Sequence, residues 1–297
     1  MAVLSDVAVE LLPRCRFPSA GEPLPCAVSG GADSLALLVL AVAAGCRATA
    51  YHVDHALRAG SAEEAEVVRA AAGRVGAGFV ALTIECPAGP NLEARARRAR
   101  LAALPPGAAT GHTADDQAET ILLNLLRGAG SDGMRGMDAG PRHPILALRR
   151  AETVALVSSL GLEVVDDPSN ADPAFRRNRV RHELLPLAAE IAGRDLVPVL
   201  ARQAELFADE VELLDELAAG LDATDVGAVR KAPEALARRA VRRWLRGLDS
   251  DGYAPGARDT ERVLDVARGV ALACELPGGR RIRRSHGRLV ADAAPAR

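Results

Sequence analysis

The stretch CAVSGGADSLALL, residues 26–38, places two glycines, an aspartate and two serines between a short apolar run and a longer one. The short run predicts a buried strand, and the longer run predicts a helix that is apolar all round and therefore buried. The glycines then fall in the turn between them. Several backbone N–H groups of such a turn can point into one concavity that fits phosphate oxygens. A tight corner without a ligand is the alternative, and this stretch alone leaves both interpretations open.

In the phosphate interpretation, each residue type of the turn has a role. Gly30 and Gly31 let the backbone approach a ligand without a Cβ in the way, and Asp33 offers an oxygen ligand for Mg²⁺. A Walker-type loop is nearly excluded, because it needs Gly-Lys-Ser/Thr and Lys231 is the only lysine in the chain. We therefore expect a site of backbone amides, hydroxyls and Mg²⁺ at Ser29, Gly30, Gly31, Ala32, Asp33 and Ser34.

The pattern around the turn predicts an α/β fold. From residue 24 to about 165, short apolar runs alternate with helix-like stretches, which is typical of βαβ units and a parallel sheet. Helices are expected after the first strand, at Ser61, at Asn91 and at Thr113. The expected strands are Leu24–Val28, Arg47–Val53, Phe79–Glu85, Ala108–Thr110 and Glu163–Val165. Ligands bind such sheets at the carboxyl ends of the strands, where SGGADS, HVDHALR (52–58) and GHTADDQ (111–117) all fall.

The strand signal fades after residue 185. Helical periodicity then predicts a long or broken connecting helix, with Pro186 and Pro198 marking starts or kinks. A small C-terminal unit follows, which carries one basic helix and a terminal strand pair whose turn is Gly278-Gly279. We expect three parts, at residues 1–185, 186–221 and 222–297.

Composition excludes several classes of protein. With 49% apolar residues the chain can fill a sizeable core, whereas no apolar run is long enough for a membrane span. The first residues lack a secretory signal pattern, so a cytoplasmic location without membrane contact is expected. Five scattered cysteines without a CxxC pair argue against a disulfide framework and against zinc or iron–sulfur sites. Because only 2% of residues are aromatic, a nucleic acid would be held mainly through charge.

Downstream acids and arginines are candidate site residues. Asp116 and Glu119 share one helical face and could hold an ammonium group or Mg²⁺, or serve only as partners of the helix dipole. Arg97 lies on one face of the helix that is expected from Asn91, where a solvated ion-pair face is the alternative. His52, at the end of the second strand, fits a structural role as well as a functional one.

Six motifs occur in the order found in the tRNA(Ile)-lysidine synthase family of N-type ATP pyrophosphatases. They are SGGADS, HVDHALR, NLEARAR, GHTADDQAET, LLRGAGSDGMRGM and DPSNADPAFRRNRVRHELLP, and the resemblance covers about residues 24–187. It implies a parallel-sheet, Rossmann-like PP-loop ATPase domain, a helical linker and a small C-terminal α/β substrate domain. The first motif then binds ATP, together with His52, Val53, Gly111 and His112.

The resemblance also implies a reaction. In this family ATP adenylates the C2 carbonyl oxygen of the wobble cytidine of the isoleucine tRNA with the anticodon CAU, and the ε-amino group of free L-lysine then displaces AMP. Asp33, Asp116, Glu119 and Arg97 are the implied catalytic residues, with Mg²⁺ near Asp33 and an acid that takes the lysine proton. Clusters of basic residues are expected to contact tRNA phosphates, namely Arg176, Arg177, Arg179, Arg181, His182, Arg242, Arg243, Arg283 and Arg284. The oligomeric state stays open, a homodimer being one option.

Two other functions share the glycine loop. A tRNA thiolase uses the same adenylation chemistry but needs catalytic cysteines, and none of the five lies beside the expected site. A nucleotide-binding module without catalysis would leave the acid pair and the arginine clusters without a role.

Overall fold

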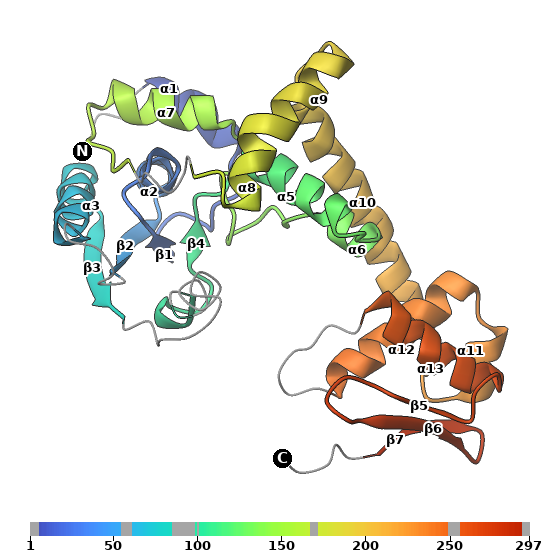
Figure 1. Ribbon diagram of the computed structural model, residues 1–297. Helices are drawn as coiled ribbons and strands as arrows, with labels where there is room; N and C mark the ends of the chain where they lie inside the picture. The colour runs from blue at the N-terminus through green and yellow to red at the C-terminus, as the bar shows by residue number, and fades with distance from the viewer. Residues whose placement is uncertain are drawn as a thin grey trace. The chain divides into compact units, whose positions relative to one another are not determined.

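The computed structural model describes residues 6–54, 61–84, 99, 101–166, 172–248 and 256–292 (Figure 1). Its contacts divide the chain into two compact units, Met1–Phe207 and Ala208–Arg297. Each unit has its own cluster of buried hydrophobic side chains. The division falls inside helix α10 (Val197–Ala219), so the boundaries expected at residues 185 and 221 stay a prediction.

The first unit is built on a parallel sheet with the strand order β3-β2-β1-β4. The strands confirm four of the five expected ones, and their bounds are β1 (Pro23–Ala27), β2 (Arg47–Asp54), β3 (Gly78–Thr83) and β4 (Ala109–Thr110). The fifth, at Glu163–Val165, is wrong, because this segment forms no strand. Val165 instead donates one backbone hydrogen bond of 3.0 Å to Gly30 in the turn after β1. Gly30 has left the extended conformation, with φ +93°, so a ladder cannot continue there.

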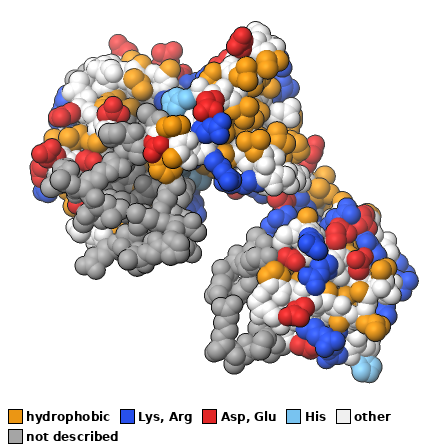
Figure 2. Space-filling view, viewed as in Figure 1, with side chains coloured by type: hydrophobic (Ala, Val, Ile, Leu, Met, Phe, Trp, Pro, Cys, Tyr) orange, Lys and Arg blue, Asp and Glu red, His pale blue; other side chains and the backbone are white. Residues whose placement is uncertain are grey.

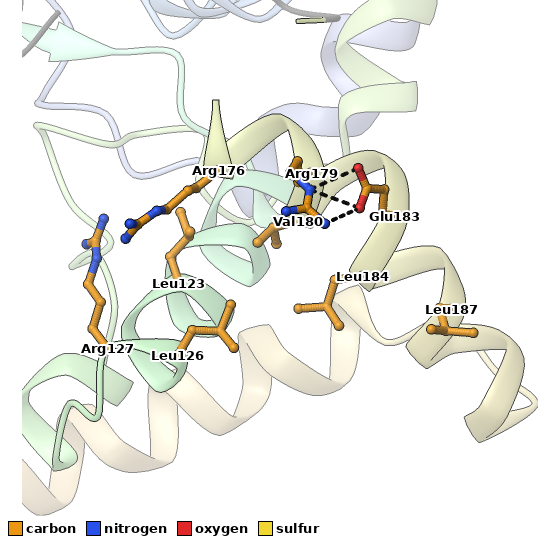
Figure 3. A pocket seen from close by; sticks show the side chains of 9 residues that line it. All are labelled: Leu123, Leu126, Arg127, Arg176, Arg179, Val180, Glu183, Leu184 and Leu187. Atoms are coloured by element: carbon orange, nitrogen blue, oxygen red, sulfur yellow. Dashed lines mark hydrogen bonds and ion pairs between the residues drawn. The ribbon is translucent and has the colours of Figure 1, made fainter. Parts of the chain in front are cut away.

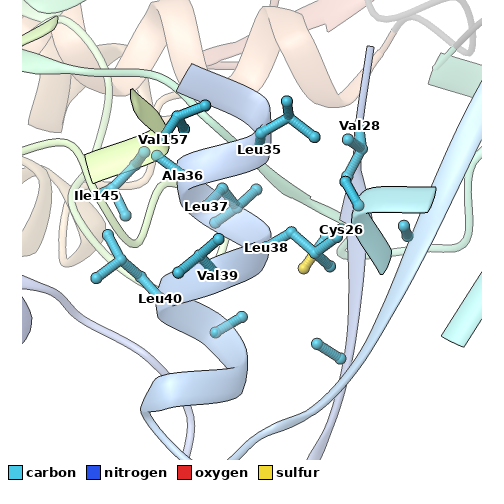
Figure 4. Close-up of a cluster of buried hydrophobic side chains, with 14 of the residues drawn as sticks. Cys26, Val28, Leu35, Ala36, Leu37, Leu38, Val39, Leu40, Ile145 and Val157 are labelled. Atoms are coloured by element: carbon cyan, nitrogen blue, oxygen red, sulfur yellow. The ribbon is translucent and has the colours of Figure 1, made fainter. Parts of the chain in front are cut away.

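Helix α2 (Ala32–Ala43) lies at the centre of the unit (Figure 1). It contacts β1 and β2 on one side, and α1 (Asp6–Leu11) and α7 (Arg150–Ser159) on the other. Figure 4 shows its leucines between Cys26 and Val28 on the sheet side and Ile145 and Val157 on the far side. Because both sides are covered, the helix is apolar all round, as expected. Helix α3 (Ser61–Val75) packs on β2 and β3.

The other helices of this unit follow β4. They are α5 (Ala114–Leu126), α6 (Ser131–Met134) and α8 (Arg176–Arg179), which continues through the π-helical turn η3 (Val180–Leu184) into α9 (Leu185–Ala192). A short 3₁₀ turn, η1 (Leu12–Arg14), follows α1. Helix α9 is followed by Gly193, whose φ is +64°, and α10 begins at Val197. Pro186 and Pro198 are the second residues of α9 and α10, which confirms the expected broken helix.

The second unit packs helices on a small antiparallel sheet. Its helices are α11 (Val226–Lys231), α12 (Glu234–Gly247) and α13 (Ala257–Arg268). The sheet has three strands rather than the expected two, β5 (Ala273–Glu275), β6 (Arg281–Ser285) and β7 (Arg288–Ala291). The turn between β5 and β6 uses Gly278 and Gly279, both with positive φ, as expected. Within the described ranges, no helix is both long and apolar enough to cross a membrane.

Candidate active site

A cleft of about 660 Å³ opens in the first unit at the carboxyl ends of β1, β2 and β4. From β1 the chain crosses to β2 on one side, whereas β4 lies on the other side of β1. The sheet order therefore reverses between β1 and β4, and ligands of open α/β sheets bind at such a switch point. The volume suits a nucleotide-sized ligand.

The glycine loop forms one wall of the cleft. Gly30 has a φ of +93°, and a Cβ at this position would lie 2.6 Å from Cγ2 of Val165, so only glycine fits. Ser34 braces the loop, since its hydroxyl donates to the carbonyl of Gly31 at 2.8 Å and accepts from the amide of Ser29 at 3.2 Å. Among the described residues, the amides of residues 30–33 have no hydrogen-bond acceptor. These four N–H groups at the start of α2 form a ready site for an anion.

The segment after β4 packs directly against this loop. A Cβ on Gly111 would lie 2.5 Å from the carbonyl oxygen of Asp33, so a side chain here would push the loop away. The next residue, His112, shares a hydrogen bond of 2.7 Å with Thr110. His52 is buried, and its Nδ1 shares a hydrogen bond of 3.0 Å with the carbonyl of Val28. These contacts fix the two other strand ends against the loop.

The structure brings most of the expected ATP residues together. Those that line the cleft are Ser29, Gly31, Ala32, Asp33, Ser34, His52, Val53, Gly111 and His112. Gly30 shapes the loop from behind and does not line the cleft. Arg97 lies outside the described residues.

Asp116, the first acid of the pair on α5, accepts hydrogen bonds from the residue that precedes its own helix. Thr113 precedes the helix, and both its amide and its hydroxyl donate to Oδ2 of Asp116 at 2.8 Å. This capping arrangement leaves Oδ1 of Asp116 directed at other partners. Glu119, one turn later, is only 1% exposed.

Three arginines surround this acid pair. Arg150, the first residue of α7, approaches Asp116 at 2.9 Å and Glu119 at 3.3 Å. Arg177 lies 2.6 Å from Glu119 and 3.0 Å from Asp116, and Arg181 lies 2.7 Å from Glu119. From the sequence we expect the acid pair to hold an ammonium group or Mg²⁺, or to serve as partners of the helix dipole, and we expect Arg177 and Arg181 to contact tRNA. In the structure these acids and arginines pair with each other.

Arg150 also connects the acid pair to the glycine loop. Its Nε lies 3.2 Å from Oδ2 of Asp33, whose Oδ1 accepts a hydrogen bond from the hydroxyl of Thr153. Each of the three guanidinium nitrogens thus faces a different carboxylate. Three carboxylates and three guanidiniums balance in charge, which is how buried ions are tolerated.

The surrounding residues shift the pKa values of Asp33 and Asp116 in opposite directions. Burial raises the pKa of Asp33 above its ordinary value, although Thr153 and Arg150 act against this rise. Burial also acts to raise the pKa of Asp116, but Arg150 and Arg177 outweigh it and hold that pKa below its ordinary value. Asp116 is therefore charged at neutral pH and a weak proton acceptor.

Comparisons with known proteins indicate the same family for both units of the chain. A family profile described as a PP-loop domain matches residues 13–188, and one described as the TilS substrate binding domain matches residues 225–290. The tRNA(Ile)-lysidine synthase of Nocardia farcinica is 40% identical over 297 residues, which cover 92% of either chain. The chain belongs to the tRNA(Ile)-lysidine synthase family. The relative from Thermobifida fusca, with the same name, is 36% identical over 92% of this chain and 93% of its own.

A solved structure shares the fold of this family member. It is the U34-tRNA thiolase NcsA from Methanococcus maripaludis with its [4Fe-4S] cluster, with a TM-score of 0.52. The superposition covers 69% of this chain and 80% of that one at 13% identity, so the likeness concerns the fold alone.

The four cysteines that the structure describes give no support to thiolase chemistry in this family member, and Cys86 lies outside the described residues. Cys15, Cys26, Cys46 and Cys274 are free thiols, and none lines the cleft. Burial raises the pKa of Cys26 to about 12, so its thiol is unreactive at neutral pH. Among the described residues, no group of three or more acids, histidines and cysteines could hold a metal ion.

Sequence reasoning missed two residues of the site, Arg150 and Thr153. Both lie on α7, outside every motif, and reach Asp33 across 117 and 120 residues. No spacing in the sequence signals such contacts.

The remaining arginines expected to bind tRNA lie on both units. In the first unit, Arg179 pairs with Glu183 at 2.8 Å, and His182 is exposed. In the second, Arg243 on α12 donates to the carbonyl of Ala219 at 3.2 Å. Basic and acidic side chains are interspersed on the face of this unit in Figure 2. Arg242 also lies on α12, and Arg283 and Arg284 lie on β6, so tRNA binding by these residues stays a prediction.

Proposed function

We propose that this chain uses ATP to ligate L-lysine to C2 of the wobble cytidine of the isoleucine tRNA with the anticodon CAU. The reaction passes through an adenylated tRNA, releases pyrophosphate and AMP, and yields a tRNA that reads AUA as isoleucine. Membership of the tRNA(Ile)-lysidine synthase family along both units carries this proposal. The cleft at the switch point, which is lined by most of the residues expected to bind ATP, supports it.

The first step is adenylation, and the glycine loop serves it. The amides of residues 30–33 point from the start of α2, where the helix dipole favours negative charge. They bind the phosphates and stabilise the charge that develops on them during attack. Because Gly30 and Gly111 fix the loop from both sides, these donors are in place before ATP arrives.

Asp33 is the residue that would hold Mg²⁺. Its carboxylate lines the cleft beside the loop amides, and a hard oxygen ligand is what Mg²⁺ prefers. A single carboxylate fits an ion that takes its other ligands from phosphates and water. Bound there, Mg²⁺ would neutralise phosphate charge.

The second step needs the ε-amine of lysine near the adenylated base. Asp116 and Glu119 are the acids that we assign to it, with the amine taking the place of one of the three arginines. Since the pKa of Asp116 is low, Asp116 suits binding of the charged amine rather than removal of its proton. Arg97 is proposed to orient substrate or phosphate.

The test is incubation of the chain with ATP, Mg²⁺, labelled lysine and an isoleucine tRNA(CAU) transcript. Nucleoside analysis by mass spectrometry should find lysidine in place of the wobble cytidine. Absence of lysine incorporation beside an active relative would refute the proposal. Pyrophosphate release that requires tRNA separates an enzyme from a module that only binds nucleotide. The cytoplasmic location and the oligomeric state stay predictions.

A further inference from the structure

A second cavity, of about 480 Å³, lies in the first unit away from the ATP cleft. It runs between the end of α5 and the segment α8–η3–α9, and we call it the α5–α9 groove (Figure 3). It shares no lining residue with the ATP cleft, and nothing in the proposed chemistry uses it. The residues that line it are Leu123, Leu126, Arg127, Arg176, Arg179, Val180, Glu183, Leu184 and Leu187.

Helical spacing divides the arginines of the RRNRVR segment between the two cavities. Arg177 and Arg181 are four residues apart and face the acid pair on α5. Arg176 and Arg179 lie on another face of the same helix and line the groove. Arg179 is neutralised by Glu183 at 2.8 Å. Arg176 therefore contributes a positive charge to the lining of the groove.

Arg127 and Arg176 reach toward each other at one end of the groove (Figure 3). Neither side chain has an ion-pair or hydrogen-bond partner among the residues that the structure describes, although three other arginines nearby do. Arg127 follows the last residue of α5, and the carbonyls there attract a cation. These carbonyls explain the position of the Arg127 side chain, but they do not explain why the Arg176 side chain lies close to it. Two unpaired guanidiniums that converge on one point suit a phosphate.

The rest of the groove is apolar. Leu123, Leu126, Leu184 and Leu187 form its floor and wall. Leu126 is 67% exposed and Leu187 is 53% exposed, so this apolar surface meets solvent in the structure. Exposed leucines that line a cavity together indicate a binding surface. Its occupant combines one anionic group with an apolar face.

We propose that the α5–α9 groove binds one unstacked nucleotide of the tRNA substrate. Its phosphate lies between Arg127 and Arg176, and its base packs on the leucines. This inference rests on the proposed function, since it adds a contact to the tRNA of that reaction. Unstacked bases are what proteins bind in single-stranded loops of RNA. A symmetric contact with a second copy is disfavoured, because it would bring the same two unpaired arginines of each copy to one interface.

Four variants of the full chain test the groove, with tRNA affinity measured across a salt series. Arg127→Gln and Arg176→Gln should each weaken binding about 3- to 10-fold and lower the salt slope by about 0.7, as expected for one lost phosphate contact on a single strand. Leu126→Asn should weaken binding about 3-fold or more with an unchanged slope, since it removes apolar packing against the base and no charge. Leu125→Asn is the matched control, because Leu125 is 56% exposed on the same helix and lies outside the groove.

A charge control and a footprint complete the experiment. Arg16→Gln removes an exposed arginine outside both cavities and should leave affinity and slope unchanged. Ethylnitrosourea footprinting should show one phosphate that wild type protects and that both groove arginine variants leave reactive. ATP binding should be equal in all variants, which shows that they are folded.

The outcomes separate this inference from the proposed function. If wild type forms lysidine but the groove variants bind tRNA with unchanged affinity and slope, the groove inference is wrong and the function stands. A change in sedimentation of Leu126→Asn with unchanged tRNA binding overturns it in favour of contact between copies. If the wild-type chain binds tRNA but forms no lysidine, and the groove variants lose that binding, the proposed function is wrong and the groove still binds RNA.

Discussion

Arg150 offers the sharpest test of the site, because its three guanidinium nitrogens face Asp33, Asp116 and Glu119. Among the residues that the structure describes, Arg150 is the one cation that contacts both the glycine loop and the acid pair, and Arg150→Gln removes it. Arg150→Lys keeps the charge but offers a single nitrogen, which cannot face three carboxylates in a fixed fork. We therefore expect both variants to impair the enzyme, and the lysine variant to be intermediate.

The structure sets the size of the effect. Breaking a buried ion pair by removing one partner costs roughly 3–5 kcal/mol. The Arg150 side chain is 25% exposed, and Arg177 and Arg181 still contact Glu119 afterwards. Both facts reduce the loss, so we expect the free energy of unfolding to fall by about 2–3 kcal/mol. Asp33, which we propose to be catalytic, loses its contact with Nε and can shift. Misplacement of a catalytic group by about 1 Å costs on the order of 100-fold in rate.

Arg149 is the matched control, since it is the adjacent residue and also holds two acids. It lies 3.1 Å from Asp115 and 2.5 Å from Asp195, and it lines neither cavity. Urea unfolding should show that Arg149→Gln and Arg150→Gln both lose stability. Single-turnover release of pyrophosphate should fall about 10- to 100-fold only in the Arg150 variants. Equal activity of the two glutamine variants, at saturating ATP, would refute the positioning role of Arg150.

Three further predictions follow from the site. Gly111→Ala should cost about 1–3 kcal/mol of stability and weaken ATP binding, because its Cβ would lie 2.5 Å from the carbonyl of Asp33. Gly73→Ala, in open space on α3, should be neutral or stabilising in the same thermal melts and ATP titrations. Replacement of all five cysteines should leave lysine incorporation intact, and loss of activity in a folded variant would instead favour thiolase chemistry. The pKa of Asp116 is lower folded than unfolded, so its stabilising effect is present above about pH 4 and is lost below that pH. Asp116→Asn should therefore flatten the loss of stability between about pH 4 and pH 2, measured by urea unfolding at each pH, and an unchanged profile would contradict the ion pairs.

Some parts of the fold could be predicted from the sequence because they depend only on residues that are close together in the chain. The glycine turn, the buried helix α2 and the acid-capped start of α5 each follow from residues within a few positions of one another. The segment at residues 163–165 predicts a strand for a local reason as well, since two of its three residues are valines, which favour strands. It forms no strand, because Gly30, the residue that it would pair with, leaves the extended conformation where pairing would begin.

The site could be predicted only in part, because charge pairing depends on distant residues. A run such as RRNRVR looks basic in the sequence, and the sequence does not show which of its arginines meet acids. Helical spacing sends Arg177 and Arg181 to Glu119, 58 and 62 residues away, and leaves Arg176 facing the groove. Counting basic residues thus overestimates the charge that is available for RNA.

The same pairing links the two halves of the proposed reaction. Asp33 belongs to the loop that we propose binds ATP, and Glu119 belongs to the acid pair that we assign to lysine, yet the guanidinium of Arg150 contacts both acids. An amine that replaces an arginine at Glu119 must disturb the contacts of Asp33 if that arginine is Arg150, but not if it is Arg177 or Arg181. Because Arg177 and Arg181 contact the acid pair without contacting Asp33, we expect the lysine substrate to displace one of these two arginines while the loop keeps its geometry.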